Sequence, residues 1–261
     1  MTGSGLTLRG GNAYVTGSGM LINNGTLRGL SSPNGVGLAA SPGVTVVNNG
    51  TLAAQAGGRL SIENLFGPAR TVSVATGGEV TLGGTYTLNQ NLSLNGATLT
   101  LNGDWANTAT LTAVNSTVNL GGEFTLADLG NFTRTAGAVN LTGTLVNTGG
   151  MLALNATTGS WNLAGGTLRG GRVTTVGGAE LLFPVYSGTL DGVTIDGVAR
   201  FTAPVAVIAV TNGLTVNGSL FVTATDGASG LSFTGTQIVG GTGVVDLDAG
   251  SLYFPEPDAA L

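Results

Sequence analysis

The side chains of this sequence that could do chemistry are its carboxylates, because the residue types that usually act beside them are absent. The chain has 13 acidic residues and eight Arg, with no Cys, His or Lys among its 261 residues. This composition excludes Cys and His nucleophiles or bases, Lys Schiff bases, the Walker phosphate loop, and zinc sites built on imidazole or thiolate. What remains is carboxylate chemistry, either a two-carboxylate glycoside hydrolase or calcium bound by oxygen ligands.

Asp246 and Asp248 are the first candidates for such a site. They lie two residues apart in Val-Val-Asp-Leu-Asp, so in a strand both would face solvent while Val245 and Leu247 face the core. Two carboxylates without a third ligand make a poor calcium site. We therefore predict a solvated outer face and keep the pair as ligand candidates.

Asp191 and Asp196 each precede a glycine and lie five residues apart. They could form an acid pair, but Asp-Gly is a common turn dipeptide, and we predict turns at both. The segment Gly166–Gly170 (Gly-Thr-Leu-Arg-Gly) aligns with Gly188–Gly192 (Gly-Thr-Leu-Asp-Gly). If these segments stack, Arg169 forms an ion pair with Asp191, and the pair marks a 22-residue register.

Trp105 and Trp161 could be platforms on which sugar rings stack. Their separation along the chain is not a whole number of the repeats described next, so they should not share a column. We keep both as ligand candidates and predict that they are partly buried residues of corners or loops.

A short repeat decides the architecture. The tripeptide Gly-Thr-Leu begins at Gly25, Gly50, Gly143, Gly166 and Gly188. Neighbouring copies begin 22 to 25 residues apart, and the one long interval, from Gly50 to Gly143, is close to four such spacings. The period is therefore about 23 residues, which indicates repeat architecture. Within a repeat the apolar residues alternate, as in Ala97-Thr98-Leu99-Thr100-Leu101, and Gly or Asn-Gly closes each run. Alternation of this kind predicts short strands with tight corners and almost no helix.

These features predict an all-β chain folded as a parallel β-helix (β-solenoid) of about eleven coils, with roughly 22–23 residues per coil. We expect a single domain over residues 1–261. Residues 1–70 are less regular and suggest an N-terminal cap, 71–250 form the regular coils, and 251–261 form a C-terminal cap or linker. Asn24 and Asn49 occupy equivalent corners, so we expect their amides to stack as a ladder between coils.

Charge and hydropathy exclude several partners. A net charge of −5 leaves no basic footprint for nucleic acid. The longest apolar stretch, at 203–210, is far shorter than the roughly 18 residues of a membrane span, so we expect no membrane insertion. No basic region and apolar run follow Met1, and we interpret the chain as a mature or excised piece.

The segments Asn23–Leu27 (Asn-Asn-Gly-Thr-Leu), Asn48–Leu52 (the same five residues) and Gly165–Gly170 resemble bacterial surface and secreted β-helix proteins. The nearest examples are filamentous-haemagglutinin-like exoproteins and autotransporter passenger domains. The resemblance implies a chain that is exported to the extracellular space or the bacterial cell surface and lacks Cys. It also implies a right-handed parallel β-helix that acts as an adhesin, a stalk or a display scaffold.

The expected function is therefore that of a structural stalk, adhesin or matrix element, without enzymatic activity and without a cofactor or metal. One alternative is the subunit of an extracellular filament, because uncovered solenoid ends invite pairing with another chain. Another, of a different class, is a polysaccharide-active hydrolase or lyase. Expected partners are a second copy or the flanking domains of a longer chain, and host or surface glycans.

Overall fold

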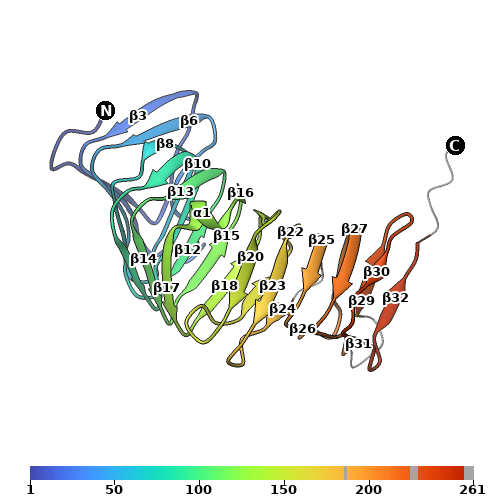
Figure 1. Ribbon diagram of the computed structural model, residues 1–261. Coiled ribbons are helices and arrows are strands. Elements are labelled where there is room, and N and C mark those ends of the chain that lie inside the picture. The colour runs from blue at the N-terminus through green and yellow to red at the C-terminus, as the bar shows by residue number, and fades with distance from the viewer. Residues whose placement is uncertain (185–186, 224–228, 256–261) are drawn as a thin grey trace, which may run out of the picture. The chain divides into compact units, whose positions relative to one another are not determined.

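The computed structural model describes residues 1–184, 187–223 and 229–255. The chain is all-β with 2% helix, and its parallel sheets stack as a β-solenoid of about eleven turns with roughly 21 residues per turn (Figure 1). This confirms the predicted fold class. The chain divides into two compact units, Met1–Ala138 and Val139–Leu261. The expected boundaries at residues 70 and 250 remain predictions, and residues 256–261 of the expected C-terminal segment lie outside the described residues.

The first unit stacks its strands in three rows, and each described pairing within it is parallel. One row consists of β1 (Thr7–Gly10), β4 (Thr26–Gly29), β7 (Thr51–Ala54) and β9 (Thr71–Val74). Another consists of β2 (Asn12–Val15), β5 (Gly37–Ala40), β8 (Arg59–Pro68), β10 (Glu79–Leu88), β12 (Thr98–Leu101) and β15 (Thr117–Leu120), with β3 (Gly19–Asn23), β6 (Val44–Asn48) and β13 (Asp104–Asn107) paired beside them. The third consists of β11 (Leu92–Asn95), β14 (Thr110–Val114) and β17 (Asn131–Thr135), and the chain between β15 and β17 forms β16 (Glu123–Phe124) and helix α1 (Leu126–Leu129).

The second unit contains two main rows of parallel strands. One consists of β18 (Ala138–Leu141), β21 (Trp161–Leu163), β24 (Leu181–Phe183), β26 (Val198–Phe201), β28 (Ser219–Phe221) and β31 (Val244–Asp246). The other consists of β19 (Thr144–Val146), β22 (Thr167–Arg169), β25 (Ser187–Ile195), β27 (Val207–Val216), β29 (Gly230–Phe233) and β32 (Ser251–Tyr253), with β20 (Met151–Leu154), β23 (Arg172–Thr175) and β30 (Val239–Gly240) paired beside them. No helix in the described parts of the chain is long and apolar enough to cross a membrane.

The repeated tripeptide stacks as predicted, but it does not mark one row throughout. Thr26 and Leu27 pair in register with the same residues of the next copy in β4 and β7. The three later copies stack in β19, β22 and β25, which belong to a different sheet. The tripeptide is therefore a local marker of register within each group of coils.

The coils in the middle of the first unit are shorter than the predicted period. Thr98 of β12 pairs with Glu79 on one side and with Thr117 on the other. The hydrogen-bonded side chains of Asn119 and Thr100 in the same two coils are likewise 19 residues apart. The corners that precede β12 and β15 each begin with a residue of positive φ, Gly96 (59°) and Asn115 (47°). A left-handed residue turns the chain over a short distance, and these corners therefore shorten the coil.

The alternating residues form the core that the pattern predicted. Ala97, Leu99 and Leu101 are buried, whereas Thr98 and Thr100 are half-buried on the outer side. Full burial of each such Leu, Ile or Val side chain contributes about 1.5–3 kcal/mol relative to exposure. The solenoid is therefore held together by a continuous apolar interior with no need for cross-links.

Two amide ladders run beside each other at the corner before β4 and β7. The predicted one is confirmed, because Asn49 Nδ2 donates to Asn24 Oδ1 at 3.0 Å on the exposed side. The second ladder is buried and was not predicted: Asn23 Nδ2 donates to Asn48 Oδ1 at 2.6 Å, and both side chains are at most 1% exposed. Asn48 Nδ2 also donates to the carbonyl of Ala69 in the next coil.

The buried ladder should matter far more to stability than the exposed one. Replacing Asn48→Ala removes the 2.6 Å bond from Asn23 and the bond to the buried Ala69 carbonyl, so we expect a loss of about 1–3 kcal/mol in the free energy of unfolding. Asn49→Ala is the matched control and should cost about 0.5 kcal/mol or less. Urea denaturation of both variants measures the difference, and equal losses would contradict this account of the corner.

Candidate functional site

Several charged side chains of the described residues form ion pairs that join successive coils. Four of these pairs are Arg59–Glu79 (3.0 Å), Arg169–Asp191 (3.5 Å), Arg172–Asp196 (2.6 Å) and Arg200–Glu180 (3.0 Å). Arg169 and Asp191 are direct register partners in β22 and β25, which confirms the predicted ladder pair. Since the partners of each pair are 20 to 24 residues apart, the pairs fasten one coil to the next.

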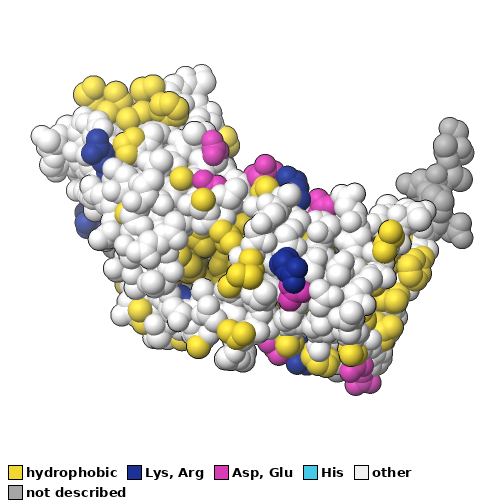
Figure 2. Space-filling view, in the orientation of Figure 1, with side chains coloured by type: hydrophobic (Ala, Val, Ile, Leu, Met, Phe, Trp, Pro, Cys, Tyr) yellow, Lys and Arg dark blue, Asp and Glu magenta, His cyan; other side chains and the backbone are white. Residues whose placement is uncertain are grey.

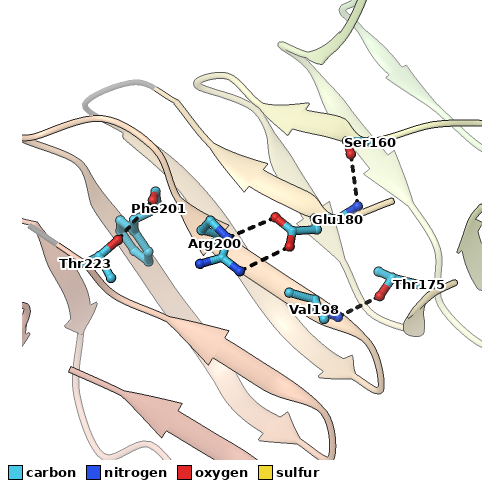
Figure 3. A network of polar contacts seen from close by, with 7 residues as sticks. All are labelled: Ser160, Thr175, Glu180, Val198, Arg200, Phe201 and Thr223. Carbon is cyan, nitrogen blue, oxygen red and sulfur yellow. Dashed lines mark hydrogen bonds and ion pairs between the residues drawn. The ribbon is translucent and has the colours of Figure 1, made fainter. Parts of the chain in front are cut away.

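The pair between β26 and the residue preceding β24 is the most completely bonded (Figure 3). Arg200 donates two hydrogen bonds to the Glu180 carboxylate, from Nε at 3.0 Å and from a terminal nitrogen at 3.2 Å. Its guanidinium carbon also lies 4.3 Å from the ring centroid of Phe221, in the next coil. The hydrogen bonds to Glu180 raise the pKa of Arg200. The Arg200 guanidinium therefore connects three successive coils, through Glu180 on one side and Phe221 on the other.

Asp191 and Asp196 do not form an acid pair, because each is engaged with a neighbouring coil. Asp191 accepts hydrogen bonds from Thr211 and Asn212 in addition to its Arg169 partner. Hydrogen bonds from Asn217 and then from Arg172 hold the pKa of Asp196 below its usual range. The chain bends after Asp196, where β25 has ended, as predicted.

The turn predicted at Asp191 is wrong. This residue lies inside β25, at an irregularity of the β25–β27 register that Gly192 allows with a φ of 64°. A left-handed glycine bends the strand there without ending it.

Asp246 and Asp248 are both exposed, as predicted. The expectation that Leu247 faces the core is wrong, since β31 ends at Asp246 and Leu247 is 39% exposed. Among the residues that the structure describes, no group of three or more acidic side chains could hold a metal ion. Among the described residues, the pair therefore has no third carboxylate beside it.

Trp105 and Trp161 lie in strands and not in corners or loops, which corrects the prediction for both. They are 2% and 3% exposed and face the interior from β13 and β21. The Trp105 ring packs against Phe124 with centroids 4.9 Å apart, and its Nε1 donates to the Gly121 carbonyl at 2.8 Å. The Nε1 of Trp161 is buried without a hydrogen-bond partner in the described structure.

An open groove of about 360 Å³ on the first unit brings aromatic and acidic side chains together. Its wall and rim include Phe66 and Pro68 of β8, Tyr86 of β10, Asp104 and Trp105 of β13, and Asp128 of α1. Three strands place these residues, because Phe66, Thr85 and Asp104 are register partners in three successive coils. A period equal to the shorter coils would have aligned Phe66, Thr85 and Asp104 from the sequence, whereas the period of about 23 residues taken from the tripeptide does not.

The two carboxylates of the groove differ in their surroundings. Asp128 caps α1: its Oδ2 accepts hydrogen bonds from the Thr125 amide at 2.8 Å and from the Thr125 hydroxyl at 2.7 Å. Asp104 is exposed at the rim. Burial raises the pKa of the Tyr86 phenol, whose hydroxyl donates to the Leu82 carbonyl at 3.2 Å. The Tyr86 phenol therefore remains neutral, and its hydroxyl serves as a buried hydrogen-bond donor to the backbone.

Comparison of the chain with protein-family models, with curated proteins and with solved structures gave no match.

The two tryptophans provide a test of how their surroundings differ. Trp105→Phe removes a buried hydrogen bond and leaves the Gly121 carbonyl unsatisfied, whereas Trp161→Phe removes an indole N–H that has no partner. Both changes create a similar cavity, so Trp105→Phe should cost about 1–3 kcal/mol more in the free energy of unfolding. Chemical denaturation of the two variants in parallel makes the comparison, and the opposite order would refute the assigned bonding.

Proposed function

We propose that this chain is a non-catalytic β-solenoid that acts outside the cell or on its surface as a stalk, adhesin or matrix element. One observation carries the proposal: the described ion pairs and amide ladders are formed between successive coils. Arg200 and Glu180 in the second unit and Asn23 and Asn48 in the first illustrate this use of polar groups. A catalytic site requires such groups to converge on a substrate instead.

The two acids of the groove do not favour hydrolysis. Glycoside hydrolysis needs one carboxyl that donates a proton and a second that acts as a base or nucleophile. Asp128 is bound into the capping box of α1 through two hydrogen bonds to Thr125. A carboxylate fixed in this way serves the local fold, which leaves Asp104 as the free acid of the groove.

An extracellular location is supported by the sequence. The chain contains no Cys that oxidation could damage, only 8% of its residues are charged, and its repeats resemble those of exported bacterial β-helix proteins. A stack in which each coil covers its neighbour suits a spacer that holds other parts away from a surface.

The proposal predicts no turnover of polysaccharides. Purified chain incubated with neutral and acidic polysaccharides should release no more reducing ends or unsaturated products than the Asp104→Asn/Asp128→Asn double variant. Protease treatment of intact cells that produce the chain should remove it, because it is displayed outside. Cleavage that the double variant lacks, or complete protection in intact cells, would refute the proposal.

A second candidate, the filament subunit, is favoured by apolar side chains on the outermost coils. In the first unit β1, β2 and β3 each pair on one side only, and Tyr14 and Met20 are each 62% exposed. Among the described strands of the second unit, β31 and β32 pair on one side only, and Val244 is 58% exposed. Figure 2 shows hydrophobic side chains gathered over β3 and, in the second unit, over β32. Unpaired strand edges of this kind template association with another chain.

Filament formation has a direct test. Negative-stain microscopy of purified chain at rising concentration should show rods that lengthen by end-to-end contact. Met20→Asp or Val244→Asp places a charge on an outer coil and should abolish the lengthening. Met151→Asp, at a residue that is 54% exposed on β20, is the matched control and should leave it intact. Rods of constant length at all concentrations would exclude the filament.

A further inference from the structure

We infer that the groove between β8, β13 and α1 is a saccharide-binding site that takes a glycan without acidic groups. The inference rests on the proposed adhesive function and deepens it by naming a ligand class and the residues that receive it. The groove encloses about 360 Å³, which lies at the lower end of the range for small-ligand sites. It lies wholly within the first unit.

The wall of the groove presents carbon surface to its ligand. Phe66 is 58% exposed on the outer side of β8, and Pro68 lies two residues further along the same strand. Tyr86 and Trp105 are turned inward, and their polar atoms are bonded to the Leu82 and Gly121 carbonyls. The platform on which the flat C–H face of a sugar ring can pack is therefore the exposed Phe66 ring, with Pro68 further along the same strand.

The rim of the groove supplies hydrogen-bond acceptors. Asp104 is an exposed carboxylate, which when ionised only accepts hydrogen bonds, and Asp128, bound through Oδ2 to Thr125, adds a second carboxylate beside it. Thr85 and Thr87 of β10 add hydroxyl groups. No Arg is among the residues described as lining the groove, so a ligand must provide donors and must not carry negative charge. Hydroxyl and amino groups of a neutral or basic saccharide meet both conditions, whereas uronic acids and sulfated sugars would be repelled.

A peptide fits the groove less well than a saccharide does. An extended peptide binds such folds by adding a strand to a free edge. The central strand of the groove, β10, is already paired on both sides, with β8 and with β13. Its backbone therefore offers no ladder to a peptide, and recognition is left to the aromatic ring and the carboxylates.

The test is binding by calorimetry of three probes to the full chain: a glucosamine oligosaccharide, a neutral glucan oligosaccharide and an oligogalacturonate. We expect binding of at least one of the first two and none of the third. Phe66→Ala should weaken that binding about tenfold, because the stacking surface is lost. Asp104→Asn should weaken it about threefold or more, because a neutral amide is a poorer acceptor than a carboxylate.

Matched controls separate the groove from general effects. Tyr14→Ala removes another exposed aromatic ring, Asp246→Asn removes another exposed charge, and neither should change binding. Equal urea midpoints for Phe66→Ala and the parent chain show that the fold is retained. Absence of binding to all three probes, preference for oligogalacturonate, or unchanged binding in Phe66→Ala with Asp104→Asn would overturn the inference while leaving the proposed scaffold intact. Shortened oligosaccharides after incubation would overturn the non-catalytic proposal and leave the binding site standing.

Discussion

The structure depends on one constraint, the parallel pairing of each coil with the coil before it. Because a residue in a strand pairs with the residue one coil away, whatever occupies one position is stacked on its counterpart in the next coil. Leucine then stacks on leucine in the interior, and asparagine on asparagine at the corners. A charged side chain likewise lies next to the residue at the same position of the adjacent coil. Asp191 is paired in this way with the guanidinium of Arg169. Residues that are one repeat apart in the sequence are thus stacked in columns in the structure.

Contacts between residues at equivalent positions of two copies of the tripeptide motif could be predicted from the sequence. The tripeptide aligned Arg169 with Asp191 and Asn24 with Asn49, and both contacts are present. The groove could not be found in this way, since Phe66 and Asp104 lie where the coils are short and no tripeptide reports the shorter register. The buried asparagines were missed for another reason: in Asn23-Asn24 the pattern does not say which amide turns inward.

The two tryptophans and Leu247 show how tertiary context overrides a local pattern. The sequence predicted that Trp105 and Trp161 were partly buried residues of corners or loops, yet both are inward residues of strands that pair with the neighbouring coils. Alternation placed Leu247 inside, but the strand ends one residue earlier. In a solenoid, local alternation predicts a side, and only the neighbouring coil determines whether that side is covered.

The short helix α1 has a consequence for how such a chain can diversify. Thr125 and Asp128 close the start of this excursion with their own hydrogen bonds, and its end is fixed to the stack by the buried Leu129 and by the bond from Asn107 of β13 to the Leu129 carbonyl. Exchanging Ala127 and Asp128, which are not buried, would alter the acidic rim of the groove while Leu129 keeps its place in the interior. The residues that line the groove from α1 can therefore change while the stacked strands stay the same, and one solenoid framework could carry different binding specificities.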